Sequence, residues 1–323
     1  MTALADSVRA GRRRALGRAL TWVESRDERG DALLALLADG SGTFRLGITG
    51  APGVGKSSLV AELIGRLRRA GERVAVVAVD PTSPISGGAL LGDRLRMRGH
   101  QDDDGVFIRS LASRSGVGGL AGATDEVAEL LARAGFGIVL IETVGVGQLE
   151  MGIAGEADAV FLLISPEGGD VIQFLKGGLM EVVDRIVVNK SDRPGADETL
   201  RVVRQLAHER DEAEPLAVSC HEGRGLDDLV EVILEAARQH RADARPERAV
   251  TRVERRVRRR LEDRWLERAW ARVGGRDIAR EAAERIARGE ARFVEEVEAL
   301  ARQGEIDASE SANERSKKSN SGE

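Results

Sequence analysis

The chain has 323 residues, of which 42% are hydrophobic and 32% charged, and its formal net charge is −5. This composition excludes a disordered chain. The negative charge and an aromatic content of 3% argue against nucleic acid as a partner. The single cysteine, Cys220, excludes an internal disulfide framework. Because there is neither a signal-peptide pattern nor an apolar run approaching the ~18 residues of a membrane span, we expect a cytoplasmic protein with no membrane partner.

Residues 1–40 are expected to form an N-terminal helical extension, because their leucines recur at helical spacing. Residues 244–304 are rich in Arg and Glu, and their apolar residues stand four apart from Val253 to Trp265. A Gly-Gly pair then interrupts the pattern, and apolar residues at helical spacing return over residues 277–303, where we expect a second helix. The two helices together predict a helical hairpin. Residues 305–323 contain almost nothing apolar and are expected to be a disordered tail.

Between these ends, residues 41–243 alternate apolar runs with amphipathic helical patterns. The alternation predicts an α/β fold with a mainly parallel sheet flanked by helices, and a site at the carboxyl ends of the strands. The predicted strands are at residues 44–49, 74–79, 106–108, 137–142, 159–164, 185–189 and 216–219.

A phosphate-binding motif follows the first predicted strand and opens a helix. The segment from Gly50 to Ser57 matches the P-loop pattern G-x-x-x-x-G-K-[ST], whose glycines let backbone N–H groups surround phosphate oxygens. Lys56 is expected to reach the β- and γ-phosphates, and the Ser57 hydroxyl to occupy one position around Mg²⁺. The nucleotide-binding residues predicted here are Gly50, Ala51, Pro52, Gly53, Val54, Gly55, Lys56, Ser57 and Ser58.

A second motif, Asn189-Lys190-Ser191-Asp192, selects guanine over adenine. The Asp192 carboxylate can accept hydrogen bonds from the guanine ring N–H and exocyclic amine, whereas adenine would leave it unpaired. The Lys190 stem can pack over the base. These features predict GTP/GDP as the ligand. The guanine-contacting residues expected are Asn189, Lys190 and Asp192, with the looser segment Ser219, Cys220 and His221.

Three acidic residues end or follow strands on the phosphate side of the predicted sheet: Asp80, Asp93 and Glu142. With Ser57 they form the predicted Mg²⁺ site, although an Asp before a turn is as readily explained as a cap of that turn. Glu142 begins an E-x-x-G sequence that ends at Gly145, and it resembles the D-x-x-G motif of GTPases. The residues expected to promote hydrolysis are Lys56, Asp93, Glu142 and Gly145.

Hydrolysis by the isolated chain is predicted to be slow. Many GTPases place a water-orienting Gln directly after the glycine of this motif, and here Val146 follows Gly145. We therefore expect a partner to complete the site.

Five segments together resemble the MeaB/ArgK family, the GTPase chaperones of methylmalonyl-CoA mutase. They are residues 50–58, 78–83, 87–93, 142–148 and 189–192, and the resemblance covers roughly residues 3–300. The run E-T-V-G-V-G-Q at 142–148 is its most specific part.

The resemblance implies properties that the residues alone do not. The partner would be an adenosylcobalamin-dependent acyl-CoA mutase whose cofactor loading, protection or reactivation is gated by GTP hydrolysis. Asp93 and Glu142 would serve Mg²⁺, the segments 80–93 and 166–178 would be switches, and the C-terminal hairpin would be the dimerisation arm of a homodimer. Leu149 and residues 151–153 depart from the family pattern, which leaves the identity of the mutase open.

Three alternatives remain open from the sequence. Relatives in the same branch are metallochaperones, which need Cys and His clusters, and this chain has one Cys and four dispersed His. An older label for the family, a kinase or ATPase of arginine and ornithine transport, would require ATP, which Asp192 disfavours. The arginines between Arg252 and Arg260 could bind RNA or an acidic protein, although a solvated helix face balanced by nearby acids is favoured.

Overall fold

The structure is a computed structural model that describes residues 1–37, 42–81, 99, 102–113, 123–143, 152–167, 178–210, 213–243, 247–275 and 277–302. The chain divides into two compact units, Met1–Arg252 and Val253–Glu323. The predicted tail at 305–323 lies outside the described residues. Within the described ranges, every helix is too short or too polar to cross a lipid bilayer.

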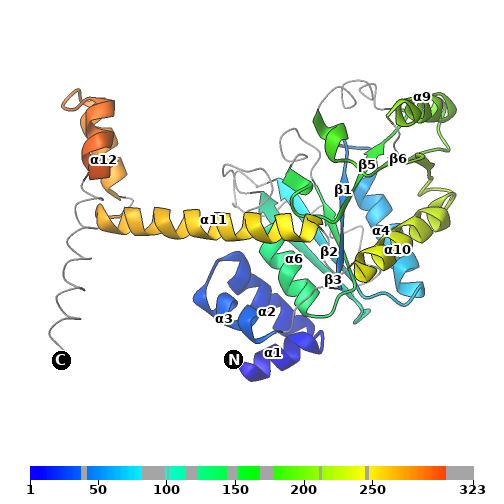
Figure 1. Cartoon of the computed structure of the whole chain (residues 1–323), viewed down its shortest axis with the longest axis horizontal. Coiled ribbons are helices and arrows are strands. Elements are labelled where there is room, and N and C mark those ends of the chain that lie inside the picture. Colours follow the sequence, from blue (N-terminus) through cyan, green and yellow to red (C-terminus); the bar gives the residue numbers. More distant parts are fainter. Residues whose placement is uncertain are drawn as a thin grey trace. The chain divides into compact units, whose positions relative to one another are not determined.

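The first unit is built on a seven-stranded sheet in the order β3-β2-β4-β1-β5-β6-β7, in which every pairing is parallel (Figure 1). Strand β1 is central, and its Leu46 pairs with Leu140 on one side and Ala159 on the other. This confirms the predicted parallel α/β fold. The strands are β1 (Phe44–Thr49), β2 (Val74–Pro81), β3 (Val106–Ser113), β4 (Ile138–Glu142), β5 (Ala159–Ile164), β6 (Arg185–Val188) and β7 (Leu216–Ala217).

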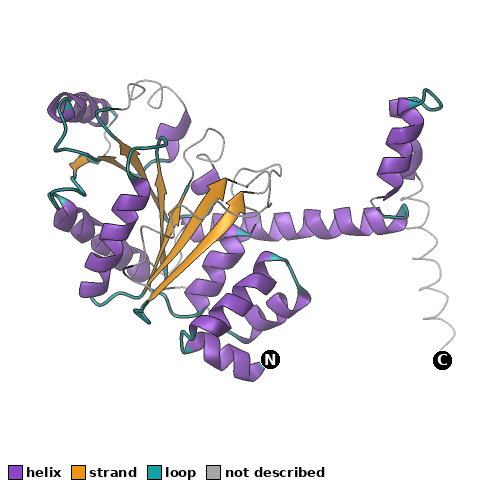
Figure 2. Cartoon of the chain, turned by 180° about the vertical axis from the view of Figure 1, so that it is seen from behind, coloured by secondary structure: helices purple, strands orange, loops and turns teal. Residues whose placement is uncertain are grey.

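Helices cover both faces of the sheet, as Figure 2 shows. One face packs against the N-terminal helices α1 (Thr2–Arg9), α2 (Arg13–Glu24) and α3 (Glu28–Leu36) and against α6 (Thr124–Arg133). The opposite face packs against α4 (Lys56–Arg69) and α10 (Leu226–Ala242). A smaller cluster joins β5 and β6 to the 3₁₀ helix η2 (Gly178–Val182) and α9 (Ala196–Glu209).

Strand β1 illustrates how alternation divides the two cores. Phe44, Leu46 and Ile48 point into the core shared with α4 and α10, because successive strand residues face opposite sides of a sheet. Gly47 faces the other side, where a Cβ atom would lie 2.7 Å from the Ile153 side chain. The absence of a side chain therefore allows the segment before β5 to pack directly on the strand.

The second unit contains most of α11 (Glu247–Arg272), together with α12 (Asp277–Ala287) and a further helical stretch at 293–302. Gly274 and Gly275 end α11 in left-handed conformations, and the Gly275 N–H donates to the Trp270 carbonyl at 2.7 Å. The sequence predicts one helix over 277–303, but the chain turns at Gly289, where φ is +73°. These helices line an open apolar pocket of about 380 Å³.

Candidate nucleotide-binding site

The P-loop joins the end of β1 to the start of α4, and two of its glycines are required by close approaches. A Cβ atom at Gly50 would lie 2.2 Å from the Leu163 carbonyl oxygen, and one at Gly55 would lie 2.4 Å from Nδ2 of Asn189. Both residues have positive φ, +143° and +97°, as does Gly53 at +81°. The sharp turn brings the loop back over the N-terminus of α4, where backbone N–H groups favour an anion.

The Lys56 ammonium is folded into this loop. Its Nζ donates to the carbonyl oxygens of Gly50 at 2.7 Å and Ala51 at 3.0 Å, and the residue is only 7% exposed. A buried ammonium held by neutral carbonyls interacts strongly with any anion that reaches it. The structure therefore places Lys56 where a phosphate in the loop would meet a positive charge.

Ser57 and Glu142 meet beside the P-loop. The Ser57 Oγ donates to Glu142 Oε1 at 2.6 Å, and both side chains are buried. Thr143, the residue after Glu142, donates its hydroxyl to that of Thr49, the last residue of β1, at 3.1 Å. Because β4 pairs directly with β1, Glu142 at the end of β4 lies beside the P-loop that follows β1.

This donor set fits Mg²⁺, which prefers oxygen ligands and keeps several waters. In the part of the chain that the structure describes, no group of three or more His, Cys, Asp and Glu residues is arranged to hold a metal ion. Ser57 and Glu142 would thus hold the ion together with water and nucleotide oxygens. The side chain of Asp80, whose backbone pairs with Ala112 at the end of β2, lies outside the described residues. Asp93 and Gly145 lie outside them as well.

Asn189 links the base-reading loop to the P-loop. It follows β6, and its Nδ2 donates to the Val54 carbonyl at 2.8 Å, while its Oδ1 accepts a 3.5 Å contact from the Cys220 thiol. The residue is 2% exposed. The base contact expected of Asn189 stays a prediction, and the structure shows in addition that Asn189 joins three loops that are distant in the chain. The feature of the sequence that could have indicated this linking role is the position of Asn189 as the first residue of the N-K-x-D motif.

Asp192 is oriented by Ser219. The Ser219 Oγ donates to Asp192 Oδ1 at 2.6 Å and accepts from the Glu222 N–H at 3.1 Å. The hydroxyl is thus both a hydrogen-bond donor and an acceptor. The hydrogen bond from Ser219 lowers the pKa of Asp192, which keeps the carboxylate ionised and accepting. The guanine contact expected of Ser219 stays a prediction, and its hydroxyl in addition holds Asp192.

Lys190 has φ of +56°, and its Nζ lies 2.6 Å from Glu167 Oε2. The hydrogen bond from Lys190 lowers the pKa of Glu167, which lies in the loop after β5. Cys220 is half-buried, and desolvation raises the pKa of its thiol to about 11. His221 is exposed beside it. The predicted guanine-contacting residues lie on two loops, one after β6 and one after β7, which meet at the contact between Asn189 and Cys220.

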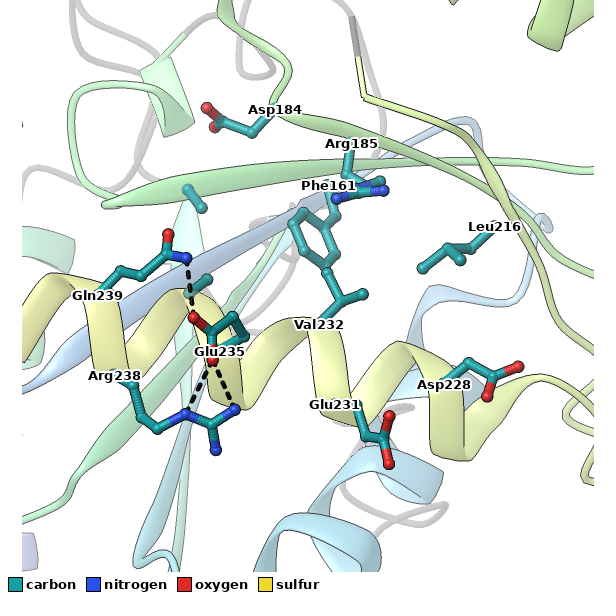
Figure 3. Close-up of a pocket in the computed structure, with 12 residues that line it drawn as sticks. Phe161, Asp184, Arg185, Leu216, Asp228, Glu231, Val232, Glu235, Arg238 and Gln239 are labelled. Carbon is teal, nitrogen blue, oxygen red and sulfur yellow. Dashed lines mark hydrogen bonds and ion pairs between the residues drawn. The ribbon is translucent and has the colours of Figure 1, made fainter.

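A separate cleft of about 630 Å³ runs along α10 (Figure 3). Its floor includes Phe161 and Leu216, and its rim carries carboxylates such as Glu235, which pairs with Arg238. Ala159 and Arg185, the first residues of β5 and β6, also line it. Because the P-loop follows the carboxyl end of β1, this cleft is not part of the nucleotide site.

The fold and these loops define a P-loop GTPase: the P-loop follows the central strand β1, and the N-K-x-D motif follows β6. The model of the family described as methylmalonyl-CoA mutase-associated GTPase MeaB matches residues 16–273. The chain belongs to this family, which confirms the resemblance drawn from the motifs.

Individual relatives agree with this assignment. A putative GTPase of Pyrococcus horikoshii is 47% identical over 197 residues, which cover 61% of this chain and 62% of the relative. The chain thus spans about three fifths of that relative's length. A probable GTPase of Mycobacterium tuberculosis is 38% identical over 303 residues, covering 89% and 90% of the two chains. Among solved structures, one described as LAO/AO transport system kinase matches with a TM-score of 0.60 and 28% identity, covering 93% of this chain and 96% of its own.

Proposed function

We propose that this GTPase is a cytoplasmic chaperone that gates cofactor loading, protection or reactivation of an adenosylcobalamin-dependent acyl-CoA mutase such as methylmalonyl-CoA mutase. The observation that carries the proposal is the family match over residues 16–273, whose description names that mutase. The site geometry supports a role in which GTP binding and hydrolysis time the chaperone's action. Asn189 connects the loop after β6 to the P-loop through the Val54 carbonyl, so the two parts of the site are linked.

In this proposal GTP binds with Mg²⁺, which neutralises phosphate charge when bound. Lys56 would hold the β- and γ-phosphates, while Ser57 and Glu142 would hold the ion, with Asp80 and Asp93 as further ligands. The Gly145 N–H would contact the γ-phosphate. Hydrolysis is slow until the mutase completes the site, since Val146 replaces the usual Gln.

The functional unit in this proposal is a homodimer joined by the arm at residues 244–304. Support comes from α11, where Val257, Leu261 and Trp265 are exposed and stand four residues apart. Such a stripe is typical of a helix that packs on a partner. Light scattering of the purified chain tests the dimer. Leu261→Glu is expected to yield monomers, whereas Leu36→Glu, at an exposed leucine outside the arm, is the control and should remain dimeric.

Co-purification with a candidate mutase tests the chaperone function. Association is expected to differ between GDP and a non-hydrolysable GTP analogue, and absent or nucleotide-independent association contradicts the proposal. Asp192→Asn supplies the matched control, because it is expected to weaken GTP binding far more than ATP binding and to remove the nucleotide effect. If ATP displaces labelled GTP as well as GDP does, the transport kinase function becomes the better account.

A further inference from the structure

Lys190, the second residue of the N-K-x-D motif, is held in a left-handed backbone conformation with φ of +56°. A non-glycine residue is strained in this conformation, and the strain persists where the surrounding structure fixes the chain. On one side, the Asn189 N–H donates to the carbonyl of Ile164, the last residue of β5, at 2.9 Å. On the other side, the Ser191 N–H donates to the carbonyl of Val218, the residue after β7, at 3.0 Å. The two neighbouring strands therefore fix the backbone from which the Lys190 side chain extends.

The Lys190 ammonium is tied to an acid from the loop after β5. Its Nζ donates to Glu167 Oε2 at 2.6 Å, and 30% of the Lys190 side chain and 52% of the Glu167 side chain are exposed. The loops after β5 and β6 also lie against each other beside this pair, because a Cβ atom at Gly195 would be 3.8 Å from the Pro166 Cβ. The aliphatic stem of Lys190 is thus held at both of its ends, by the backbone and by the ion pair.

A second cation lies near Glu167 but is closer to another acid. Arg193 Nε is 3.9 Å from Glu167 Oε1 and 3.6 Å from Asp192 Oδ2. Both distances exceed that of a hydrogen bond, and 59% of the Arg193 side chain is exposed. Among the residues that the structure describes, the principal partner of Glu167 is therefore Lys190.

We propose that Glu167 is a positioning residue for guanine recognition, which acts by holding the Lys190 stem where it packs over the base. A free lysine side chain has many rotamers, and ordering one of them when a ligand binds lowers the affinity. An ammonium that is already fixed by Glu167 reduces this loss. Glu167 contacts the far end of the stem and so acts through Lys190. The proposal rests on the predicted guanine contacts of Lys190 and Asp192, and it is independent of which protein the GTPase serves.

Glu167→Gln in the full chain tests this role, because glutamine keeps the size of the side chain and removes its charge. The affinity for GDP is expected to fall about threefold at low salt, which is the size expected of a partly exposed ion pair. The difference from the wild type should shrink at ~0.5 M NaCl, where screening weakens the wild-type pair. Glu198→Gln is the matched control, because Glu198 pairs with Arg201 on α9 in an exposed contact outside the site. Its affinity for GDP should equal that of the wild type.

A double-mutant cycle shows whether Glu167 acts through Lys190. Lys190→Met keeps an apolar stem and removes the ammonium, so in this background Glu167→Gln is expected to lose its effect on GDP affinity. A general disturbance of the loop after β5 would instead give the same loss with either residue at position 190, and that result would overturn the proposal. Wild-type GDP affinity in Glu167→Gln, while Asp192→Asn weakens GDP as expected, would overturn this proposal alone. An unchanged guanine preference in Asp192→Asn would overturn the guanine site and this proposal with it.

Discussion

The Ser57 hydroxyl, in the first turn of α4, donates a 2.6 Å hydrogen bond to Glu142 Oε1 at the end of β4. The two residues are 85 positions apart in the chain. They meet because β4 is hydrogen-bonded to β1, so the end of β4 lies beside the loop that follows β1. This pair is the described part of the proposed Mg²⁺ site, and it leads to the first prediction.

Ser57→Ala and Glu142→Gln are each expected to weaken the apparent affinity for Mg²⁺ in the GDP complex by about tenfold or more, because each removes an oxygen that holds or orients the ion. Fluorescent GDP titrated with Mg²⁺ and with EDTA measures the effect. Ser7→Ala, which removes an exposed hydroxyl bonded to the Ala3 carbonyl, is the control and should match the wild type. Unchanged Mg²⁺ dependence in both site variants would place the ion elsewhere.

Ser219→Ala is expected to make GDP binding sensitive to mild acid. Ser219 lowers the pKa of Asp192 in the wild type, so the carboxylate stays ionised, and binds guanine, to a pH below the ordinary aspartate range. Without that hydrogen bond the pKa rises, and affinity is lost at a higher pH. GDP affinity measured from pH 6 to pH 3 tests this, since the two profiles separate around and below the ordinary aspartate range. Identical pH profiles for the variant and the wild type would show that Ser219 does not set the charge of Asp192.

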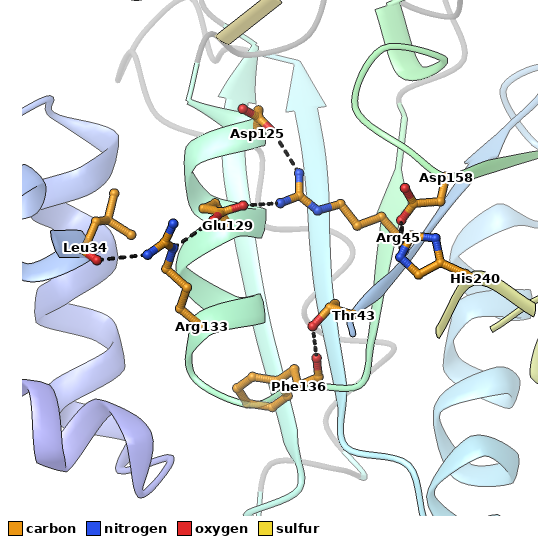
Figure 4. Close-up of polar contacts among 9 residues, drawn as sticks. All are labelled: Leu34, Thr43, Arg45, Asp125, Glu129, Arg133, Phe136, Asp158 and His240. Carbon is orange, nitrogen blue, oxygen red and sulfur yellow. Dashed lines mark hydrogen bonds and ion pairs between the residues drawn. The ribbon is translucent and has the colours of Figure 1, made fainter. Parts of the chain in front are cut away.

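Arg45→Met is expected to destabilise the first unit by about 3–5 kcal/mol, because it leaves the buried Asp125 and Glu129 without their shared cation (Figure 4). Urea unfolding measures the loss. Arg201→Met provides the contrast, since Arg201 pairs with Glu198 at an exposed position and its loss should cost under about 1 kcal/mol. Similar costs for the two substitutions would mean that the buried cluster contributes no more than a surface pair.

Cys220 is expected to react slowly with thiol reagents in the folded protein. Burial raises the pKa of its thiol to about 11, so at pH 8 the reactive thiolate is rarer by roughly two orders of magnitude than in an ordinary cysteine. The rate should rise steadily as the pH approaches 11. Since this is the single cysteine of the chain, the guanidinium-unfolded protein serves as the control. Equal rates for folded and unfolded protein at pH 8 would contradict the prediction.

Much of the fold was predictable because its signals are local. Strand β1, the P-loop and α4 are consecutive in the chain, and the glycines of the loop mark the positions of its positive φ angles. The alternation of apolar runs with amphipathic helices indicated a parallel sheet in the same way. The sequence pattern failed to predict the turn at Gly289, which separates α12 from the helix at 293–302. A single glycine within a helical pattern is compatible with a continuous helix, so it gave no signal for this turn.

The sequence alone therefore determined the class of fold, the phosphate loop and the guanine-reading motif, because each of these is a short run of neighbouring residues. Only the tertiary structure decided which loops touch. It joined Asn189 to Val54, Ser57 to Glu142, and Arg45 to Asp125 and Glu129, across separations of 80 residues or more. Those pairings depend on the order of strands in the sheet and on which helix covers which face, and no local pattern in the chain encodes either one.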